Sequence, residues 1–209
     1  MFEEVLSKEA LEVLDQISSQ LKGFYLAGGT GLALQIGHRR SYDLDFFSVQ
    51  MFEVEPFIRA LSPNKIFLAE SGTLHFELKG ITISLLFYES PLIFQPIEWK
   101  GIQLADERDI AAEKIKTISQ RGAKKDFIDL YALLTKYSVT QVCQFFKKRF
   151  SRTNINIYHV VKSLIFFEDA EGDPLPPMLV SGKQWQWPEI KKYFMTNIQV
   201  FERELGVEL

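Results

Sequence analysis

The chain has 209 residues with one cysteine, Cys143, which excludes an internal disulfide, and its net charge of −3 excludes the overall basic field of a general nucleic-acid binder. Hydrophobic residues make up 46% and charged residues 24%, an ordinary globular composition, and no run of about 18 apolar residues indicates a membrane span. Residues 1–21 carry five acidic side chains and no uninterrupted apolar stretch, so we expect no signal peptide and a cytoplasmic location.

Helical and strand-like patterns alternate in the first half of the chain. We expect helices over residues 7–21, 30–36 and 54–61, and strands over 24–27, 43–47, 65–69, 73–79, 81–88 and 102–105. Ser7 is suited to cap the first helix. Residues 38–41 should form a polar turn. Gly80 is the only break between two of the strands, which predicts a hairpin with a tight turn at Lys79-Gly80.

The second half of the chain is helical in character. Helices are expected over 106–121, 124–136, 139–150 and 155–167 and from Pro188 to about residue 205, and the Asp-, Gly- and Pro-rich segment 168–182 predicts a loop. We therefore expect an α+β fold, with a mixed sheet and flanking helices in residues 1–105. Residues 106–209 should form a helical domain that contributes to the same site.

Two carboxylates stand two residues apart at the start of one expected strand. Because side chains alternate between the faces of a strand, Asp43 and Asp45 should share one face, about 6–7 Å apart. At an effective dielectric constant of about 20 they repel each other by about 2–3 kcal/mol, which a bound cation would relieve. Mg²⁺ suits such a pair, because it completes its coordination with phosphate oxygens and water. The alternative is a solvated strand face.

A strand that runs into two glycines and then a helix lies upstream of this acidic pair. Gly28 and Gly29 allow the backbone to approach a phosphate, the helix start offers free N–H groups, and Thr30 adds a hydroxyl. In the basic turn that follows, Arg39 and Arg40 either contact phosphates or merely solvate the turn, and Arg40 and Ser41 are candidates for NTP binding. This order of elements predicts a site for a nucleoside triphosphate and Mg²⁺.

Three segments resemble the AbiEii/AbiGii-type nucleotidyltransferases, a toxin family within the polymerase-beta-like nucleotidyltransferase superfamily. They are YLAGGTGLALQIGHRRSYDLDFFS at 25–48, LADERDIAAEKIKTISQRGAKKDFIDLYALL at 104–134 and WQWPEIKKYF at 185–194. The resemblance implies a nucleotidyltransferase-like fold in which Asp43 and Asp45 are catalytic metal ligands. It also implies that the chain is the toxin of a toxin–antitoxin or abortive-infection system, with an antitoxin encoded nearby.

The second of these segments has two interpretations. From the residues alone, Lys114, Arg121, Asp126 and Asp129 form a solvated helical face laced with ion pairs. The resemblance implies instead that Lys114 and Arg121 contact the triphosphate, and that Asp126 or Asp129 holds these basic residues or assists catalysis.

One position departs from the superfamily pattern, in which a third carboxylate on a later strand activates the attacking hydroxyl. Here the strand ITISLLFYE carries Ser84 at that place, and serine is no general base at neutral pH. Glu77 on the adjacent strand, or Asp129, is a candidate to replace it.

We therefore expect a nucleotidyltransferase that transfers a nucleoside monophosphate from Mg–NTP to a hydroxyl, and the resemblance implies the 3′ end of a tRNA as a possible acceptor. The alternative is a non-catalytic nucleotide- or protein-binding module with a degenerate form of the same fold, which Ser84 favours.

Overall fold

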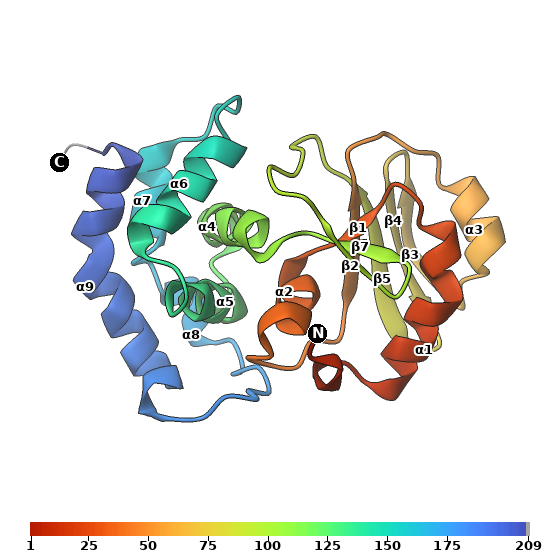
Figure 1. The fold of residues 1–209 in the computed structure, drawn as a ribbon, viewed down its shortest axis with the longest axis horizontal. Coiled ribbons are helices and arrows are strands. Elements are labelled where there is room, and N and C mark those ends of the chain that lie inside the picture. Colours follow the sequence, from red (N-terminus) through yellow and green to blue (C-terminus); the bar gives the residue numbers. More distant parts are fainter. Residues whose placement is uncertain (208–209) are drawn as a thin grey trace. The chain divides into compact units, whose positions relative to one another are not determined.

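Two units make up the chain in the computed structural model, which describes residues 1–207 (Figure 1). The first unit, Met1–Asp106, holds the strands, and the second, Glu107–Leu209, is helical. The α+β fold with a mixed sheet and flanking helices is thereby confirmed.

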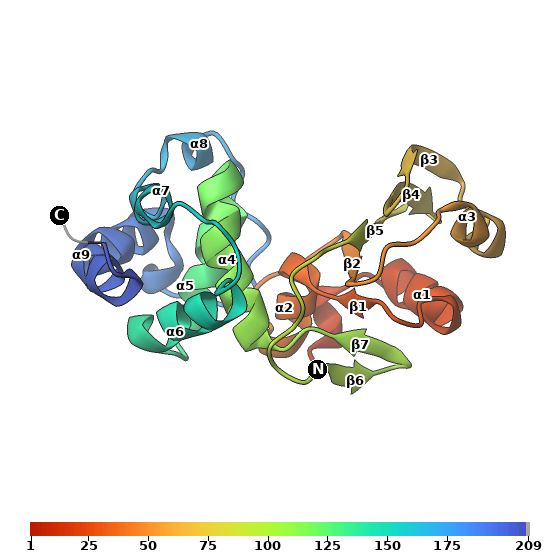
Figure 2. The same ribbon diagram turned by 90° about the horizontal axis from the view of Figure 1, so that it is seen from above.

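Strands of the first unit pair in the order β3-β4-β5-β2-β1-β7-β6, and Figure 2 shows this sheet from β3 at one end to β6 at the other. The β2–β5 and β1–β7 pairs are parallel and the remaining pairs are antiparallel. The bounds are β1 Tyr25–Leu26, β2 Leu44–Ser48, β3 Lys65–Glu70, β4 Thr73–Leu78, β5 Ile81–Phe87, β6 Ile97–Trp99 and β7 Ile102–Leu104.

The β4–β5 hairpin closes through the expected two-residue turn. Lys79 and Gly80 both have positive φ, 52° and 78°, which is the backbone of a type I′ turn. Leu78 pairs directly with Ile81 across the turn, so the register of the whole hairpin follows from it.

One face of the sheet is the hydrophobic core of the first unit. Leu44 and Phe46 of β2 and Ile83 of β5 are fully buried there, together with Leu14 and Ile17 of α1 (Lys8–Ile17). Helices α2 (Gly28–Ile36) and α3 (Glu55–Leu61) complete this unit. Because strand side chains alternate, the residues between these apolar positions lie on the opposite face of the sheet, which is free to carry polar groups.

Helix α1 begins as expected, because the Ser7 hydroxyl accepts a hydrogen bond from the Ala10 backbone N–H at 3.1 Å. It ends earlier than expected, at Ile17, and continues as a 3₁₀ turn over Ser18–Gln20.

Helices of the second unit pack around an aromatic centre. The Phe127 ring lies 5.4 Å from Phe194, 5.7 Å from Trp187 and 5.2 Å from Phe167, centroid to centroid. Helix α9 runs beside α5, α6 and α7. The bounds are α4 Glu107–Arg121, α5 Lys124–Leu134, α6 Val139–Arg149, α7 Ile157–Ser163, α8 Glu168–Glu171 and α9 Trp187–Leu205.

Three expectations were wrong in part. Strand β6, Ile97–Trp99, was not expected, and the segment expected to be a loop over 168–182 begins with the short helix α8. The expected polar turn at residues 38–41 is largely buried: His38 is 1% exposed and Arg39 is 4% exposed. The Arg39 guanidinium donates a hydrogen bond to the carbonyl oxygen of Arg40 at 2.9 Å. The Arg39 side chain therefore binds the backbone of the turn and is not solvated.

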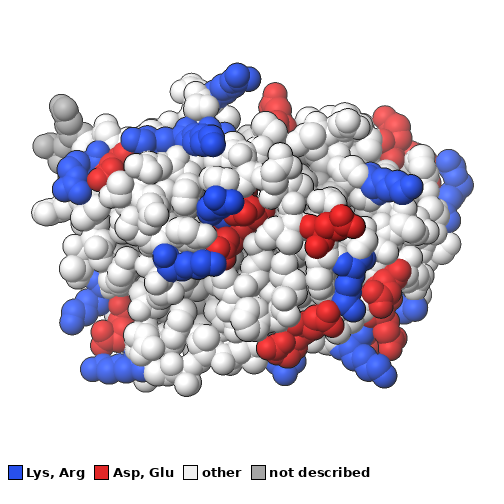
Figure 3. All heavy atoms as spheres, viewed as in Figure 1, with Lys and Arg blue, Asp and Glu red and all other residues white. Residues whose placement is uncertain are grey.

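The surface carries charges of both signs. On the face drawn in Figure 3, acidic and basic side chains are interspersed over both units. Within residues 1–207, none of the helices combines the length and the apolar character that crossing a membrane requires.

Candidate functional site

The first turn of α2 lies next to β2, and the residue of α2 at this approach is Gly28. Gly28 begins the helix with φ of 62°, and the Ala27 backbone N–H donates to the carbonyl oxygen of Asp45 at 3.1 Å. A Cβ atom added to Gly28 would lie 3.4 Å from Asp45 Oδ2. That distance is ordinary van der Waals contact, so it is the positive φ that favours glycine here, and the start of α2, with its unpaired N–H groups, lies beside an acidic side chain. Gly29 follows in the same turn and likewise brings no side chain.

Asp43 and Asp45 stand on either side of the buried Leu44. Asp45 belongs to β2 and is half-buried, whereas Asp43 lies one residue before the strand and is exposed. Alternation about Leu44 puts the Asp45 carboxylate on the face opposite the core, beside the start of α2. That Asp43 shares this face stays a prediction.

Thr30 holds the segment that leads into this pair. Its hydroxyl donates to the carbonyl oxygen of Asp43 and is hydrogen-bonded to the Ser41 hydroxyl at 2.7 Å. Thr30 is 3% exposed and Ser41 is 8% exposed, whereas Arg40 is exposed. Thr30 and Ser41 therefore fix the backbone beside the carboxylates, while Arg40 and Tyr42 on either side of Ser41 are exposed.

Ser84 is the direct neighbour of Asp45 on the sheet. The two are partners in the parallel β2–β5 pairing, and on its other side Ser84 pairs with His75 of β4. His75 Nδ1 lies 3.0 Å from Ser84 Oγ, at hydrogen-bonding distance. A carboxylate, a hydroxyl and an imidazole therefore form one row across three strands, on the face opposite the core.

Glu77 lies farther from the acidic pair than Ser84 does. It pairs with Thr82 on β5, so one whole strand separates it from β2. Neighbouring strands are about 4.8 Å apart, which places the Glu77 backbone about 10 Å from that of β2. A hydroxyl, and not an acid, consequently stands next to Asp45 on the sheet.

The predicted basic and acidic residues of the second unit form one buried cluster. Lys114 Nζ lies 2.7 Å from Asp126 Oδ1 and 2.6 Å from Asp129 Oδ2, and all three side chains are at most 5% exposed. Arg121 Nε lies 2.7 Å from Asp126 Oδ2, while the Arg121 side chain is 53% exposed. The expected solvated face is wrong, because these charges neutralise each other within the helical packing.

Burial and charge act in opposite directions on the Asp126 carboxyl. Burial alone raises its pKa, but the positive charge of Lys114, the hydrogen bond from Arg121 and the Arg121 charge together outweigh burial. The net pKa of Asp126 therefore lies below its ordinary value. The carboxylate stays ionised at neutral pH and holds both basic side chains.

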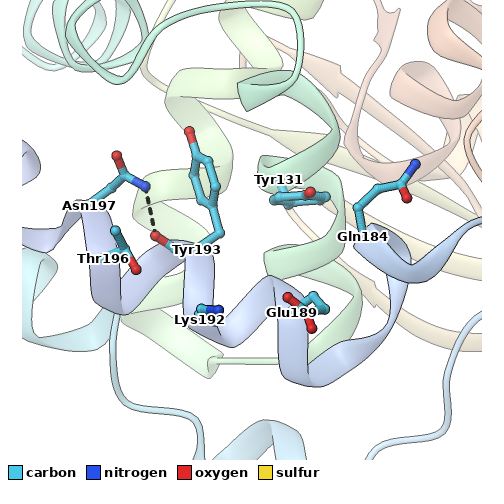
Figure 4. A pocket seen from close by; sticks show the side chains of 7 residues that line it. All are labelled: Tyr131, Gln184, Glu189, Lys192, Tyr193, Thr196 and Asn197. Carbon is cyan, nitrogen blue, oxygen red and sulfur yellow. Dashed lines mark hydrogen bonds between the residues drawn. The ribbon is translucent and has the colours of Figure 1, made fainter.

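An open depression of about 250 Å³ lies on the second unit, between α5, α9 and the segment before α9 (Figure 4). Seven residues line it: Tyr131, Gln184, Glu189, Lys192, Tyr193, Thr196 and Asn197. The Tyr131 and Tyr193 rings meet edge to face at 5.2 Å, and burial raises the pKa of both phenols. Both hydroxyls therefore stay protonated at neutral pH and are unsuited to act as nucleophiles there.

Cys143 is buried and carries no exposed thiol. Burial and the nearby Glu204 raise the pKa of this thiol to about 12, against a smaller opposing effect of Lys147. A thiol that remains protonated does not serve as a nucleophile. Within residues 1–207, no group of three or more His, Cys, Asp or Glu side chains is arranged to hold a metal ion.

An Aquifex aeolicus protein, "Uncharacterized protein aq_aa25", is 34% identical to this chain over 207 residues, covering 94% of this chain and 97% of the relative. The chain belongs to the same family as aq_aa25. No protein-family model matches the sequence. The resemblance to the AbiEii/AbiGii-type family therefore stays a prediction.

Two solved structures from Helicobacter pylori share the fold. One is named "putative nucleotidyltransferase", with a TM-score of 0.53, 17% identity and coverage of 96% of this chain and 97% of that one. The other is JHP933, with a TM-score of 0.51, 18% identity and coverage of 96% and 95%. The fold of this chain is thus nucleotidyltransferase-like over nearly its whole length, as the sequence predicts.

His75 is the residue of this row to which the sequence analysis assigned no role. A signal for it is present in the sequence. Counting outward from the turn at Lys79-Gly80 pairs Leu78 with Ile81 and, three residues further along each strand, His75 with Ser84. The register of a two-residue hairpin therefore predicts that the His75 imidazole is the cross-strand neighbour of Ser84.

Proposed function

We propose that this chain is a nucleotidyltransferase that transfers a nucleoside monophosphate from an NTP to a hydroxyl and releases pyrophosphate. The observation that carries the proposal is the approach of α2 to Asp45: a Cβ at Gly28 would lie only 3.4 Å from the Asp45 carboxylate. Such an arrangement brings together N–H groups for phosphate oxygens and carboxylates for the cation that accompanies a triphosphate.

In this proposal, the candidate site residues of the first unit have separate roles. Gly28 and Gly29 leave the backbone N–H groups at the start of α2 open to phosphate oxygens. Thr30 and Ser41 hold the chain on which Asp43 is mounted. Arg40, which is exposed, contacts the triphosphate from the side.

Asp43 and Asp45 are the proposed ligands of Mg²⁺. Two carboxylates fit this ion, which takes its remaining ligands from phosphate and water. When bound, the ion stabilises the charge on the attacking and leaving oxygens. The aspartates themselves fix where that charge is placed, because Asp45 is held within a paired strand.

Residues of the second unit have a proposed role in nucleotide binding through Arg121. Its side chain is 53% exposed, and Asp126 holds the guanidinium near the surface, where a phosphate can approach it. Lys114 pairs with Asp126 and is itself held by Asp129. The Lys114 ammonium group now faces the carboxylates of Asp126 and Asp129. To contact the triphosphate, it would have to direct one of its N–H donors to a phosphate oxygen as well.

The acceptor and the biological setting are the finer part of the proposal and rest on the resemblance to the AbiEii/AbiGii-type family. On that basis the acceptor is the 3′ end of a tRNA in the cytoplasm, and the chain is a toxin whose antitoxin is encoded nearby. Because the net charge is −3, binding of an RNA substrate would require a local basic surface.

A second candidate is a binding module that holds the nucleotide without turnover. The specific observation in its favour is Ser84, which occupies the place next to Asp45 where a third carboxylate would stand. Mg²⁺-dependent NTP binding without any transferred label would identify this alternative.

The test incubates the full chain with labelled NTPs, Mg²⁺ and total tRNA, and compares wild type with Asp43→Asn and Asp45→Asn. Each substitution keeps the side-chain volume and removes one negative ligand. Transfer should be lost in both variants, while thermal stability holds or rises slightly because the repulsion between the two carboxylates is relieved. Asp15→Asn, an exposed aspartate on α1, is the matched control and should transfer label like wild type. Labelling that persists in the Asp43→Asn/Asp45→Asn double variant would refute the mechanism.

A further inference from the structure

Asp45, Ser84 and His75 lie in one row across β2, β5 and β4, on the face of the sheet opposite the core. Ser84 is 6% exposed and His75 is half-buried. On the far side, His75 pairs with Leu68 of β3, so its cross-strand polar neighbour is Ser84. The imidazole is therefore directed to the serine that adjoins the acidic pair.

We propose that Ser84 and His75 together replace the missing third carboxylate as the proton acceptor for the attacking hydroxyl. This inference rests on the proposed nucleotidyltransferase function. Ser84 is the catalytic residue, because its hydroxyl meets the acceptor. His75 is a positioning residue that acts through Ser84.

Hydrogen-bond chemistry explains why the pair succeeds where serine alone fails. A serine hydroxyl is a donor as well as an acceptor, and by itself it does not hold an additional proton at neutral pH. In the tautomer with its proton on Nε2, His75 accepts the Ser84 proton at Nδ1, at the observed separation of 3.0 Å. The Ser84 oxygen then turns its lone pairs to the acceptor hydroxyl beside Asp45.

The resulting step balances. The acceptor oxygen forms a bond to the α-phosphorus, and the bond from that phosphorus to the β-phosphate oxygen breaks, so that pyrophosphate leaves. The acceptor proton passes to Ser84 Oγ as the Ser84 proton passes to His75 Nδ1. After transfer, the imidazolium gives its Nδ1 proton back through Ser84 Oγ to water, which restores the tautomer with its proton on Nε2, and no oxidant or further reactant is needed.

Glu77, the acid nearest along β4, is placed less well for this task. It pairs with Thr82, two residues from Ser84, and so belongs to a different row of the sheet. Its side chain shares the face of His75 but has Thr82, not Ser84, as its neighbour on β5.

The test measures steady-state transfer by the full chain in Ser84→Ala, His75→Ala and His75→Asn. We expect kcat to fall about 10²- to 10⁴-fold in all three, the range typical of general acid–base catalysis, with the KM for NTP nearly unchanged. His75→Asn is decisive, because an asparagine amide keeps a polar group near the Nδ1 position and cannot take up the proton. Thr73→Ala, on the same strand and face as His75, is the matched control and should leave kcat unchanged.

Restoring the acid provides the converse test. In Ser84→Asp the carboxylate accepts the proton directly, so His75→Ala should no longer matter, and the Ser84→Asp/His75→Ala double variant should exceed His75→Ala in kcat by at least about tenfold. A thermal melt of each variant excludes loss of fold as the cause of lost transfer.

Several outcomes would overturn the inference and are separable from failure of the proposed function. Wild-type kcat in His75→Ala, or full rescue by His75→Asn, would show that the hydrogen bond is only structural, while transfer sensitive to Asp45→Asn would still support the nucleotidyltransferase. Label retained on the protein at Ser84 would make the serine a nucleophile and not a proton acceptor. Absence of transfer in wild type with NTP bound would remove both proposals.

Discussion

At the scale of single residues, the second unit contains a cluster of four charged side chains. Lys114, Asp126 and Asp129 are almost completely buried, and Arg121 closes the group at the surface. Two positive and two negative groups balance, so none of the buried ions is left uncompensated. Removing one partner of a buried pair costs far more than the pair itself contributes, because the remaining charge stays desolvated.

Asp126→Asn should therefore destabilise the protein by about 3–5 kcal/mol, since Lys114 and Arg121 each lose the charged partner that Asp126 provides. Denaturant unfolding of both proteins at neutral pH measures this change. Asp169→Asn, an exposed aspartate in α8, should stay within about 0.5 kcal/mol of wild type. Equal free energies of unfolding for Asp126→Asn and wild type would contradict the buried-cluster account.

The same carboxyl predicts how stability depends on pH. Its pKa is lower in the folded than in the unfolded chain, where an aspartate titrates near about 3.9. Its contribution is therefore fully present above about pH 4 and is lost as the pH falls through the folded pKa. Below about pH 4, melting temperatures should fall more steeply with decreasing pH for wild type than for Asp126→Asn. Parallel curves would show that other groups dominate the acid response.

At the scale of elements, Gly28 matters in two ways: its backbone conformation starts α2, and it lies next to the candidate site. Its φ of 62° starts α2, and the space that a Cβ would fill faces Asp45. Gly23 offers a matched comparison, because it also has positive φ, 85°, but nothing lies within 4 Å of a Cβ placed there.

Gly28→Ala and Gly23→Ala should both destabilise the fold, each by about 1–2 kcal/mol, because alanine is strained at positive φ. Only Gly28→Ala should also weaken NTP binding, because its methyl group would stand at the start of α2 beside Asp45. Calorimetric titration with Mg–NTP checks this at a temperature where both variants are folded. Equal affinities in the two variants would remove Gly28 from the binding site.

Periodicity in the sequence predicts most of the helices and strands here, and it fails where tertiary contacts decide. Residues of β6 span only three positions, too few to show a period, and depend on β7 for pairing. On α5, Asp126 and Asp129 have the spacing of a surface pair, and their burial becomes possible only because Lys114 on α4 meets both.

The candidate site was predictable in those parts that depend on local order. Gly28, Asp43 and Asp45 follow from a strand–glycine–helix–strand sequence, which puts them near one another whatever the rest of the chain does. The Ser84–His75 contact depends on register instead, and register is set by a turn four residues away. Expectations based on one strand at a time therefore included Ser84 but passed over its partner.

At the scale of the whole molecule, the prediction that residues 106–209 contribute to nucleotide binding can be tested through ligand-dependent stability. A ligand bound only by the folded state stabilises it by RT ln(1 + [L]/Kd), about 2.7 kcal/mol at a hundred times Kd. Arg121 is the residue to change, because its guanidinium is half exposed while Asp126 holds it. Lys125→Ala is the control, because it removes one positive charge from an exposed neighbour.

Arg121→Ala should lower the stability of the ligand-free protein, since it takes one partner from Asp126. The informative quantity is consequently the added stability on binding Mg–NTP, measured as the shift of Tm for each variant against its own ligand-free form. We expect that shift to shrink in Arg121→Ala, to remain at the wild-type value in Lys125→Ala and to vanish in Asp45→Asn. An unchanged shift in Arg121→Ala would assign nucleotide binding to residues of Met1–Asp106 alone. In that case the buried cluster around Lys114 would serve only the stability of the helical unit.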